Sequence, residues 1–123
     1  MKLRGLHPQV HEAARWAINY AESQGVPVTV TSGYRTWEDQ ARLRERWESG
    51  QNPYPANRPG DSAHNWGLAF DSWVPEPYWQ FWDQVKRYVG FQTYPETDRV
   101  HGEYPGWRGV VKGWPRPTEH GWR

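Results

Sequence analysis

The chain contains no cysteine, and a long apolar run is also missing. Without cysteine it can form no disulfide bond and offers no thiolate to a metal, so any metal site must use other ligands. The first residues, M-K-L-R-G-L-H-P-Q, lack the apolar core of a signal peptide. We therefore expect neither a signal peptide nor a membrane span. The protein is then expected to stay in the cytoplasm until something else releases it.

A large excess of one charge is missing as well. The 15 Lys and Arg residues against 14 Asp and Glu residues give a formal charge of +1, which provides no argument for a nucleic-acid partner. The tail over residues 104–123 is an exception, because it holds one acid, Glu119, and four basic residues: Arg108, Lys112, Arg116 and Arg123. This tail could therefore face an anionic polymer.

Aromatic residues, by contrast, are abundant, with ten Trp and seven Tyr in 123 residues. A chain of this length forms one domain with a modest core, and we expect most of the rings to fill that core. The remaining rings could form a stacking surface for a sugar or a peptide ligand.

Apolar spacing predicts three helices and three extended segments. The helices are expected over residues 7–24, 36–50 and 75–89, and the extended segments over 26–32, 66–74 and 99–104. Residues 91–98 are expected to form only a connection, and the tail from residue 105 to contain no regular helix. The loop over residues 49–61 is long for so small a domain, which favours a role as a cover or a binding edge.

Several local patterns refine these elements. Thr36 is expected to cap the second helix, with Asp39 at the third position of a capping box. His7 and His11 have the spacing of a metal pair, but no acid is placed to complete a site, so we interpret them as surface or capping residues. The third helix carries an apolar stripe that predicts core positions: Tyr78, Phe81, Trp82, Val85 and Val89.

Three residues have the side chains of a catalytic zinc site. His64 and Asp71 lie seven residues apart in S-A-H-N-W-G-L-A-F-D, and His101 lies downstream in D-R-V-H. Two imidazoles and one carboxylate leave a fourth zinc position open for water. On a continuous strand His64 and Asp71 would face opposite sides, so the chain must bend between them, at Asn65 and Gly67.

Further residues could complete a hydrolytic site. Asp98 precedes His101 by three residues and could serve as the general base. Arg35 lies between a strand and a helix, where it is either an ordinary surface residue or a cation that holds an anion or a developing oxyanion. Ser62 is by default a turn or capping residue, and near His64 it could instead orient the ring or the substrate.

These residues lie in three elements that resemble one family of zinc peptidases. The run from Pro55 to Asp71 is similar to the S-x-H-x-x-G-x-A-x-D signature of the D-alanyl-D-alanine carboxypeptidase superfamily. The N-R-P-G segment within this run resembles the L-alanyl-D-glutamate endopeptidase branch, which includes phage endolysins. S-G-Y-R-T with W-E-D-Q, and D-R-V-H-G-E, are similar to two further elements of the family in the same order.

The resemblance implies a role for each residue. His64, Asp71 and His101 become ligands of Zn²⁺, Asp98 the catalytic carboxylate, and Arg35 a catalytic and substrate-binding residue. Ser62 matches the signature serine as a substrate contact. Val100 and Gly102 replace the family's Pro and Phe, so Glu103 or Glu96 remains an alternative base.

The implied fold is α+β, a small antiparallel sheet flanked by about three helices, like that of hedgehog and DD-peptidase domains. We expect a catalytic domain over residues 1–103 and a Trp-, Pro- and Gly-rich basic tail over 104–123 that packs on the same domain.

The implied activity is hydrolysis of an amide bond in the peptidoglycan stem peptide. The endopeptidase branch predicts cleavage between L-Ala and D-Glu by a monomeric cell-wall lysin of the endolysin type. Three alternatives remain open: a D,D-carboxypeptidase or dipeptidase of the same superfamily, a non-catalytic wall-binding module that uses the Trp-rich surface and basic tail, and a purely structural metal site.

Overall fold

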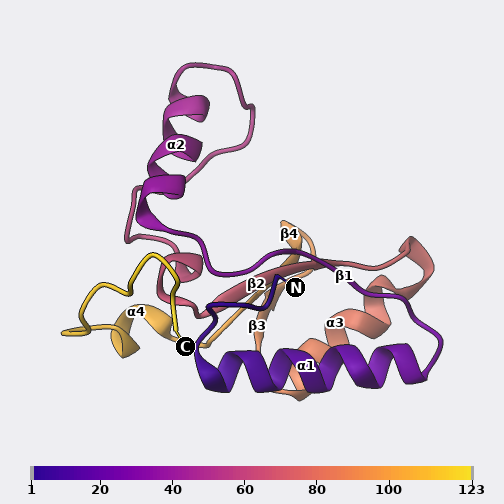
Figure 1. Cartoon of the computed structure of the whole chain (residues 1–123). Coiled ribbons are helices and arrows are strands. Elements are labelled where there is room, and N and C mark those ends of the chain that lie inside the picture. Colours follow the sequence, from indigo (N-terminus) through magenta and orange to yellow (C-terminus); the bar gives the residue numbers. More distant parts are fainter. Residues whose placement is uncertain (1, 123) are drawn as a thin grey trace.

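A computed structural model describes residues 2–122; Met1 and Arg123, the last basic residue of the expected tail, lie outside the described residues. The elements follow one another along the chain (Figure 1) as α1 (Pro8–Ser23), β1 (Thr29–Ser32), α2 (Trp37–Glu48), the 3₁₀ turn η1 (Ala63–Trp66), β2 (Ala69–Trp73), the 3₁₀ turn η2 (Glu76–Tyr78), α3 (Trp79–Tyr88), β3 (Gln92–Tyr94), β4 (Asp98–Glu103) and α4 (Trp107–Val110). The predicted α+β class is confirmed.

A four-stranded antiparallel sheet forms the centre of the molecule, with strand order β1-β2-β4-β3. In this register Asp71 of β2 lies opposite His101 of β4 on one side and opposite Ser32 of β1 on the other. The pairing of β1 with β2 is irregular between Val30 and Ser32. Three segments far apart in the sequence therefore meet at Asp71.

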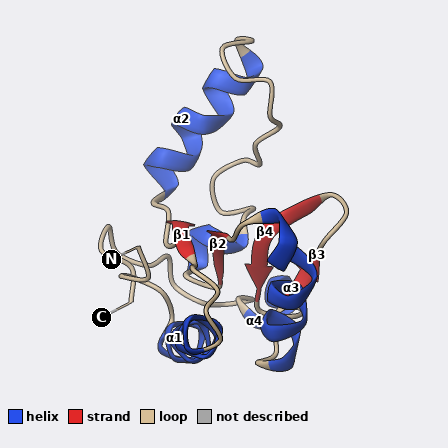
Figure 2. Cartoon of the chain, turned by 90° about the vertical axis from the view of Figure 1, so that its right-hand side faces the viewer, coloured by secondary structure: helices blue, strands red, loops and turns tan. Residues whose placement is uncertain are grey.

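The two faces of the sheet have different surroundings. Helices α1 and α3 lie on one side, and α2 projects from the other side (Figure 2). Because side chains alternate along a strand, Phe70, Ser72 and Gly102 face α3, whereas Asp71 and His101 face away from it. The core on the helical side is built from buried apolar side chains, among them Leu3, Leu6, Val10, Ile18, Leu68, Phe70, Val74, Trp82, Val85 and Phe91.

Two predicted helix caps are confirmed. Thr36 precedes α2, and its hydroxyl accepts a hydrogen bond from the backbone N–H of Asp39 at 3.0 Å. His7 precedes α1, and its Nδ1 accepts from the backbone N–H of Gln9 at 3.2 Å. Each cap satisfies a backbone donor that the first helical turn leaves unpaired.

Four predictions about the elements were wrong in detail. Strand β2 begins at Ala69 rather than at residue 66, because Gly67 ends η1 in the left-handed region at φ 71°. Residues 91–98 are more than a connection, since β3 pairs there with β4. The tail contains the short helix α4, which follows its N-cap Gly106 (φ 66°) and buries Trp107. Tyr78 of the apolar stripe is exposed rather than in the core.

The described part of the tail lies against the body of the domain. The indole N–H of Trp122 donates to the backbone oxygen of Trp66 at 2.8 Å, within the turn that carries His64. The imidazole of His7 lies 5.8 Å from the ring of Trp114 and 4.8 Å from that of Trp122. The close approach requires glycine at position 67, because a Cβ there would lie 2.6 Å from Trp122.

This packing predicts that Trp122 contributes to the stability of the whole domain. Replacing a well-packed Trp by Ala costs about 3–5 kcal/mol, and since Trp122 is only partly buried we expect Trp122→Ala to lower the free energy of unfolding by about 2–3 kcal/mol. Lys112→Ala, an exposed change in the same tail, should have little effect. Urea unfolding of both variants measures the difference; equal stability would show that the tail is not part of the domain.

Candidate metal centre and cleft

A cleft of about 540 Å³ lies over the face of the sheet opposite α1 and α3. Its floor comes from β2 and β4, and its walls from α2, η1 and the loop over residues 49–61. The predicted role of this loop at a binding edge agrees with its position, because it lines the cleft with Asn52, Tyr54, Pro55, Ala56 and Asn57. Arg35, Ser62, Asp98 and Glu103 also line it.

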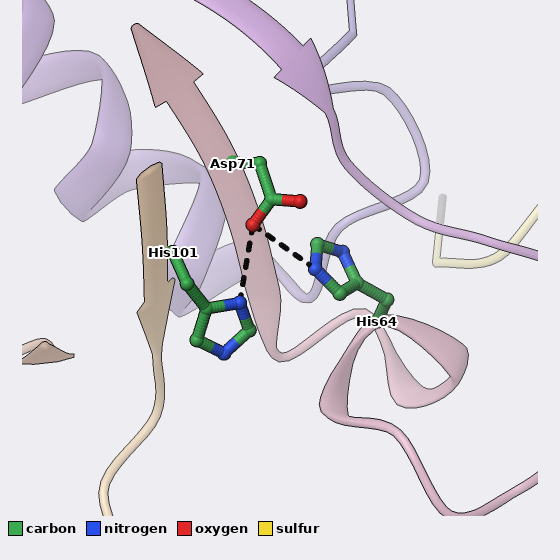
Figure 3. Close-up of side chains that lie close together, drawn as sticks. All are labelled: His64, Asp71 and His101. Atoms are coloured by element: carbon green, nitrogen blue, oxygen red, sulfur yellow. Dashed lines mark hydrogen bonds and ion pairs between the residues drawn. The ribbon is translucent and has the colours of Figure 1, made fainter. Parts of the chain in front are cut away.

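His64, Asp71 and His101 lie together at the base of this cleft (Figure 3). Nε2 of His64 lies 3.3 Å from Oδ1 of Asp71, and Nδ1 of His101 lies 3.1 Å from the same oxygen. One ligand atom from each residue falls within 4.8 Å of the others. The bend that the sequence required is present, since His64 lies in η1 and Gly67 turns the chain into β2.

The second nitrogen of each imidazole has a partner of its own. Nδ1 of His64 lies 2.8 Å from the backbone oxygen of Gly33, which can only accept a hydrogen bond, so Nδ1 carries a proton and Nε2 is the nitrogen directed at Asp71. Nε2 of His101 lies 2.7 Å from Oε1 of Glu103, which accepts its proton and leaves Nδ1 directed at Asp71. Metal-binding histidines typically have such outer partners, which fix the ring and its tautomer.

The donor set fits a tetrahedral zinc ion. With bonds of about 2.0 Å, two ligands of such an ion lie about 3.3 Å apart. The two nitrogen-to-oxygen distances to Asp71, 3.3 and 3.1 Å, are close to that value. All three residues line the cleft; His64 is 4% exposed, whereas Asp71 and His101 are only partly buried, so the site opens toward the cleft.

The charges of the three residues are strongly coupled. Burial alone would raise the pKa of Asp71, but hydrogen bonds from His101 and His64 outweigh it and hold that pKa well below its usual range. Burial alone would lower the pKa of His101, but hydrogen bonds to Asp71 and Glu103 raise it to about 9. Without a metal, therefore, His101 is a protonated imidazole between two carboxylates.

Arg35 is fixed at the edge of the cleft by two side chains. Its guanidinium donates to Oε1 of Gln40 at 3.0 Å and to Oγ of Ser32 at 3.1 Å. Burial lowers the pKa of Arg35, and the charges of Asp71 and Asp39 oppose this shift. Arg35 still carries its charge at neutral pH, because the guanidinium pKa is so high.

The three carboxylates considered as a base occupy different surroundings. Asp98 begins β4 and lines the cleft; its carboxyl group is partly desolvated there, which raises its pKa. Glu103 also lines the cleft, but it is bonded to His101 and to the hydroxyl of Tyr94. Glu96 is exposed in the turn between β3 and β4, away from the residues that line the cleft. Of the three, Asp98 and Glu103 line the cleft, and only Glu103 is engaged by His101.

Ser62 lies directly before η1, where it has a structural contact. Its Oγ accepts a hydrogen bond from the backbone N–H of His64 at 3.3 Å, as expected of a capping residue. The residue is 8% exposed and also lines the cleft, so a contact with a bound ligand remains compatible with this cap.

Several residues that support the site were not identified from the sequence. Gln40, 2% exposed, joins Arg35 to the backbone oxygen of Asn57 across the cleft wall. Asn65 is fully buried and bonds both the oxygen of Arg35 and the N–H of Gly60. The sequence indicated a role for them only through their position, in W-E-D-Q and next to His64. Polar residues are mostly exposed, so their type does not predict that they are buried.

A family model described as VanY, D-alanyl-D-alanine carboxypeptidase, matches residues 3–98. The chain is also 34% identical over 67 residues to the peptidoglycan L-alanyl-D-glutamate endopeptidase CwlK of Bacillus subtilis (strain 168). That alignment covers 54% of this chain and 40% of CwlK, so the matched part is less than half of that relative.

Solved structures share the fold at low sequence identity. The L-Ala D-Glu endopeptidase ChiX of Serratia marcescens matches with a TM-score of 0.65 and 23% identity, over 89% of this chain and 86% of its own. DacB of Streptococcus pneumoniae D39 matches with a TM-score of 0.68 and 21% identity, over 91% of this chain and 74% of its own. The vancomycin-resistance D,D-pentapeptidase VanY, solved as a mutant in complex with Zn(II), matches with a TM-score of 0.64 and 22% identity. The match covers 87% of this chain and 76% of that one.

The coupled charges predict the titration of His101. In protein stripped of metal by a chelator, its folded-state pKa of about 9 lies above the ordinary value of 6.5. Its ion pairs therefore stabilise the fold fully below pH 6.5, and this stabilisation is lost as the pH rises through about 9. NMR titration of the imidazole signals should give a pKa of about 9 for His101, and Asp71→Asn should lower this pKa. A parent value near 6.5 would contradict the described geometry.

Proposed function

The chain belongs to the VanY family of D-alanyl-D-alanine carboxypeptidases, and from this premise we propose that it is a zinc-dependent peptidase of the peptidoglycan stem peptide. The observation that carries the proposal is the arrangement of the two imidazoles. Each directs one nitrogen at Asp71 while its other nitrogen is held by Gly33 or Glu103. A purely structural ion pair would not need both rings fixed in this way.

His64, Asp71 and His101 would hold the zinc ion in this proposal. When bound, zinc supplies Lewis acidity that polarises the scissile carbonyl and lowers the pKa of water. Glu103 acts as a positioning residue, since it orients the ring of His101 from the side opposite Asp71. The similar VanY structure is a complex with Zn(II), which supports the choice of metal.

Asp98 and Arg35 would carry the proton transfer and the charge stabilisation. Asp98 takes a proton from the attacking water and passes it to the leaving nitrogen, a role that its raised pKa favours because the base must also act as an acid. Arg35, held by Gln40 and Ser32, donates hydrogen bonds to the oxyanion of the tetrahedral intermediate or to a substrate carboxylate. Ser62 would contact the substrate from the cleft wall.

The bond proposed for cleavage is that between L-Ala and D-Glu, by a monomeric cell-wall lysin. The names of CwlK and ChiX and the N-R-P-G run over residues 57–60 support this choice. The second candidate is removal of terminal D-Ala, which the description of the family model favours. Among residues 2–122, no helix is long and apolar enough to cross a membrane.

The proposal predicts one zinc ion per chain, bound through His64. We expect His64→Ala to lose the metal on dialysis, because two ligands hold zinc poorly. Glu103→Gln should weaken binding about 10–100-fold, the usual effect of an outer partner. His120→Ala, a change in the exposed tail, should retain the full equivalent. Metal analysis of the dialysed proteins gives the result; a full equivalent in His64→Ala would exclude this site.

The proposal also predicts the products of digestion. Mass spectrometry of digested muropeptides should find a new N-terminal D-Glu, whereas a lost terminal D-Ala would identify a carboxypeptidase instead. Asp98→Asn should lower kcat by about 10²–10⁴-fold while zinc content stays unchanged, since the general base is lost and the ligands remain. Glu96→Gln is the matched carboxylate control and should retain activity. Release of no amino groups by the zinc-loaded parent would favour the wall-binding module.

A further inference from the structure

A second hollow lies beside the catalytic cleft, where the N-terminal segment passes β1 and the start of α2. It has a volume of about 470 Å³ and is strongly basic. We call it the basic groove; its charged lining residues are Lys2, Arg4, Arg35, Arg42, Arg46 and Asp39. Five cations thus face one carboxylate, in a chain whose formal charge is only +1.

The basic groove and the cleft share part of their lining. Arg35 and Leu43 line both, so the two hollows are adjacent at these residues. The guanidinium of Arg35 donates to Gln40 and Ser32, and a guanidinium has five N–H donors. Arg35 therefore retains donors for a bound ligand.

Most of the positive charge in the basic groove is not neutralised within the protein. Arg42 pairs with Asp39, the one carboxylate of the groove. Within residues 2–122, Arg4 and Arg46 take part in no ion pair, and both are exposed. Lys2 donates to the backbone oxygen of Thr31 at 3.2 Å, which leaves its charge uncompensated. Clustered cations of this kind attract an anionic ligand.

We propose that the basic groove is a subsite for a free carboxylate of the stem peptide, next to the bond cleaved in the cleft. This inference rests on the proposed function. A peptide held in the cleft at Arg35 would lie next to the groove, because Arg35 and Leu43 line both hollows, and carboxylates are the anionic groups that a stem peptide carries. Guanidinium groups bind them through paired hydrogen bonds. A separate phosphate polymer would not need a groove that shares lining residues with the cleft.

Binding of two forms of one muropeptide tests the subsite. The first form has free carboxylates, and the second has them converted to carboxamides. With zinc-loaded Asp98→Asn protein, which prevents cleavage during calorimetry, we expect the free form to bind about tenfold more tightly, since two or three exposed ion pairs contribute modestly each. Adding Arg4→Gln and Arg46→Gln should remove most of this preference.

A control variant with the same loss of charge separates the groove from general electrostatics. Arg15→Gln with Lys112→Gln removes two exposed cations elsewhere and should keep the preference. Equal affinity for both muropeptides, or a preference that survives Arg4→Gln with Arg46→Gln, would overturn the subsite. So would tighter binding of poly(glycerol phosphate) that depends on Arg4 and Arg46. Cleavage by the parent protein is measured separately, so failure of the subsite and failure of the proposed activity are distinguishable.

Discussion

The pairing register between β2 and β4 is the constraint on which the site depends. It sets Asp71 directly opposite His101, and both residues line the cleft. A slip of one residue would turn one of them into the core, because side chains alternate along a strand. Phe70 and Gly102 resist such a slip, since they are buried against α3 and Phe91 on the opposite face. The hydrophobic core therefore fixes the geometry of the polar site.

A buried lysine of α3, Lys86, connects that helix to strand β4. Nζ of Lys86, on α3, donates to the backbone oxygens of Arg99 at 3.0 Å and His101 at 3.3 Å, so the helix holds β4 beneath the site. Burial lowers the pKa of Lys86 to about 8, although the charges of Asp83, Asp71 and Asp98 oppose the shift. On the other flank, Trp122 and Gly67 secure the turn that carries His64. The site is thus held by a helix and a tail that contribute no ligand to it.

The sequence was sufficient for most of the fold and for the grouping of His64, Asp71 and His101. Apolar periodicity located α1 and α3, and the opposite parity of His64 and Asp71 required the bend that Gly67 provides. Strand β3 could not be predicted, because a three-residue strand has too few positions to show alternation. The hydrogen-bond partners of Gln40, Asn65 and Glu103 could not be predicted either, because polar residues gain such partners only through tertiary contacts. The sequence of the tail shows no apolar periodicity that would predict α4 or the hydrogen bond from Trp122 to the backbone of Trp66.

In the proposed site, His64, Asp71 and His101 hold an open zinc ion and Glu103 is an outer partner. X-ray absorption spectroscopy of the zinc-loaded protein measures the ligands of this ion. We expect two imidazole nitrogens and carboxylate oxygen at about 2.0–2.2 Å, with a solvent oxygen in the remaining position. Glu103→Gln should leave this set of ligands unchanged. A closed site with four protein ligands, or a shell that loses an oxygen ligand in Glu103→Gln, would contradict it.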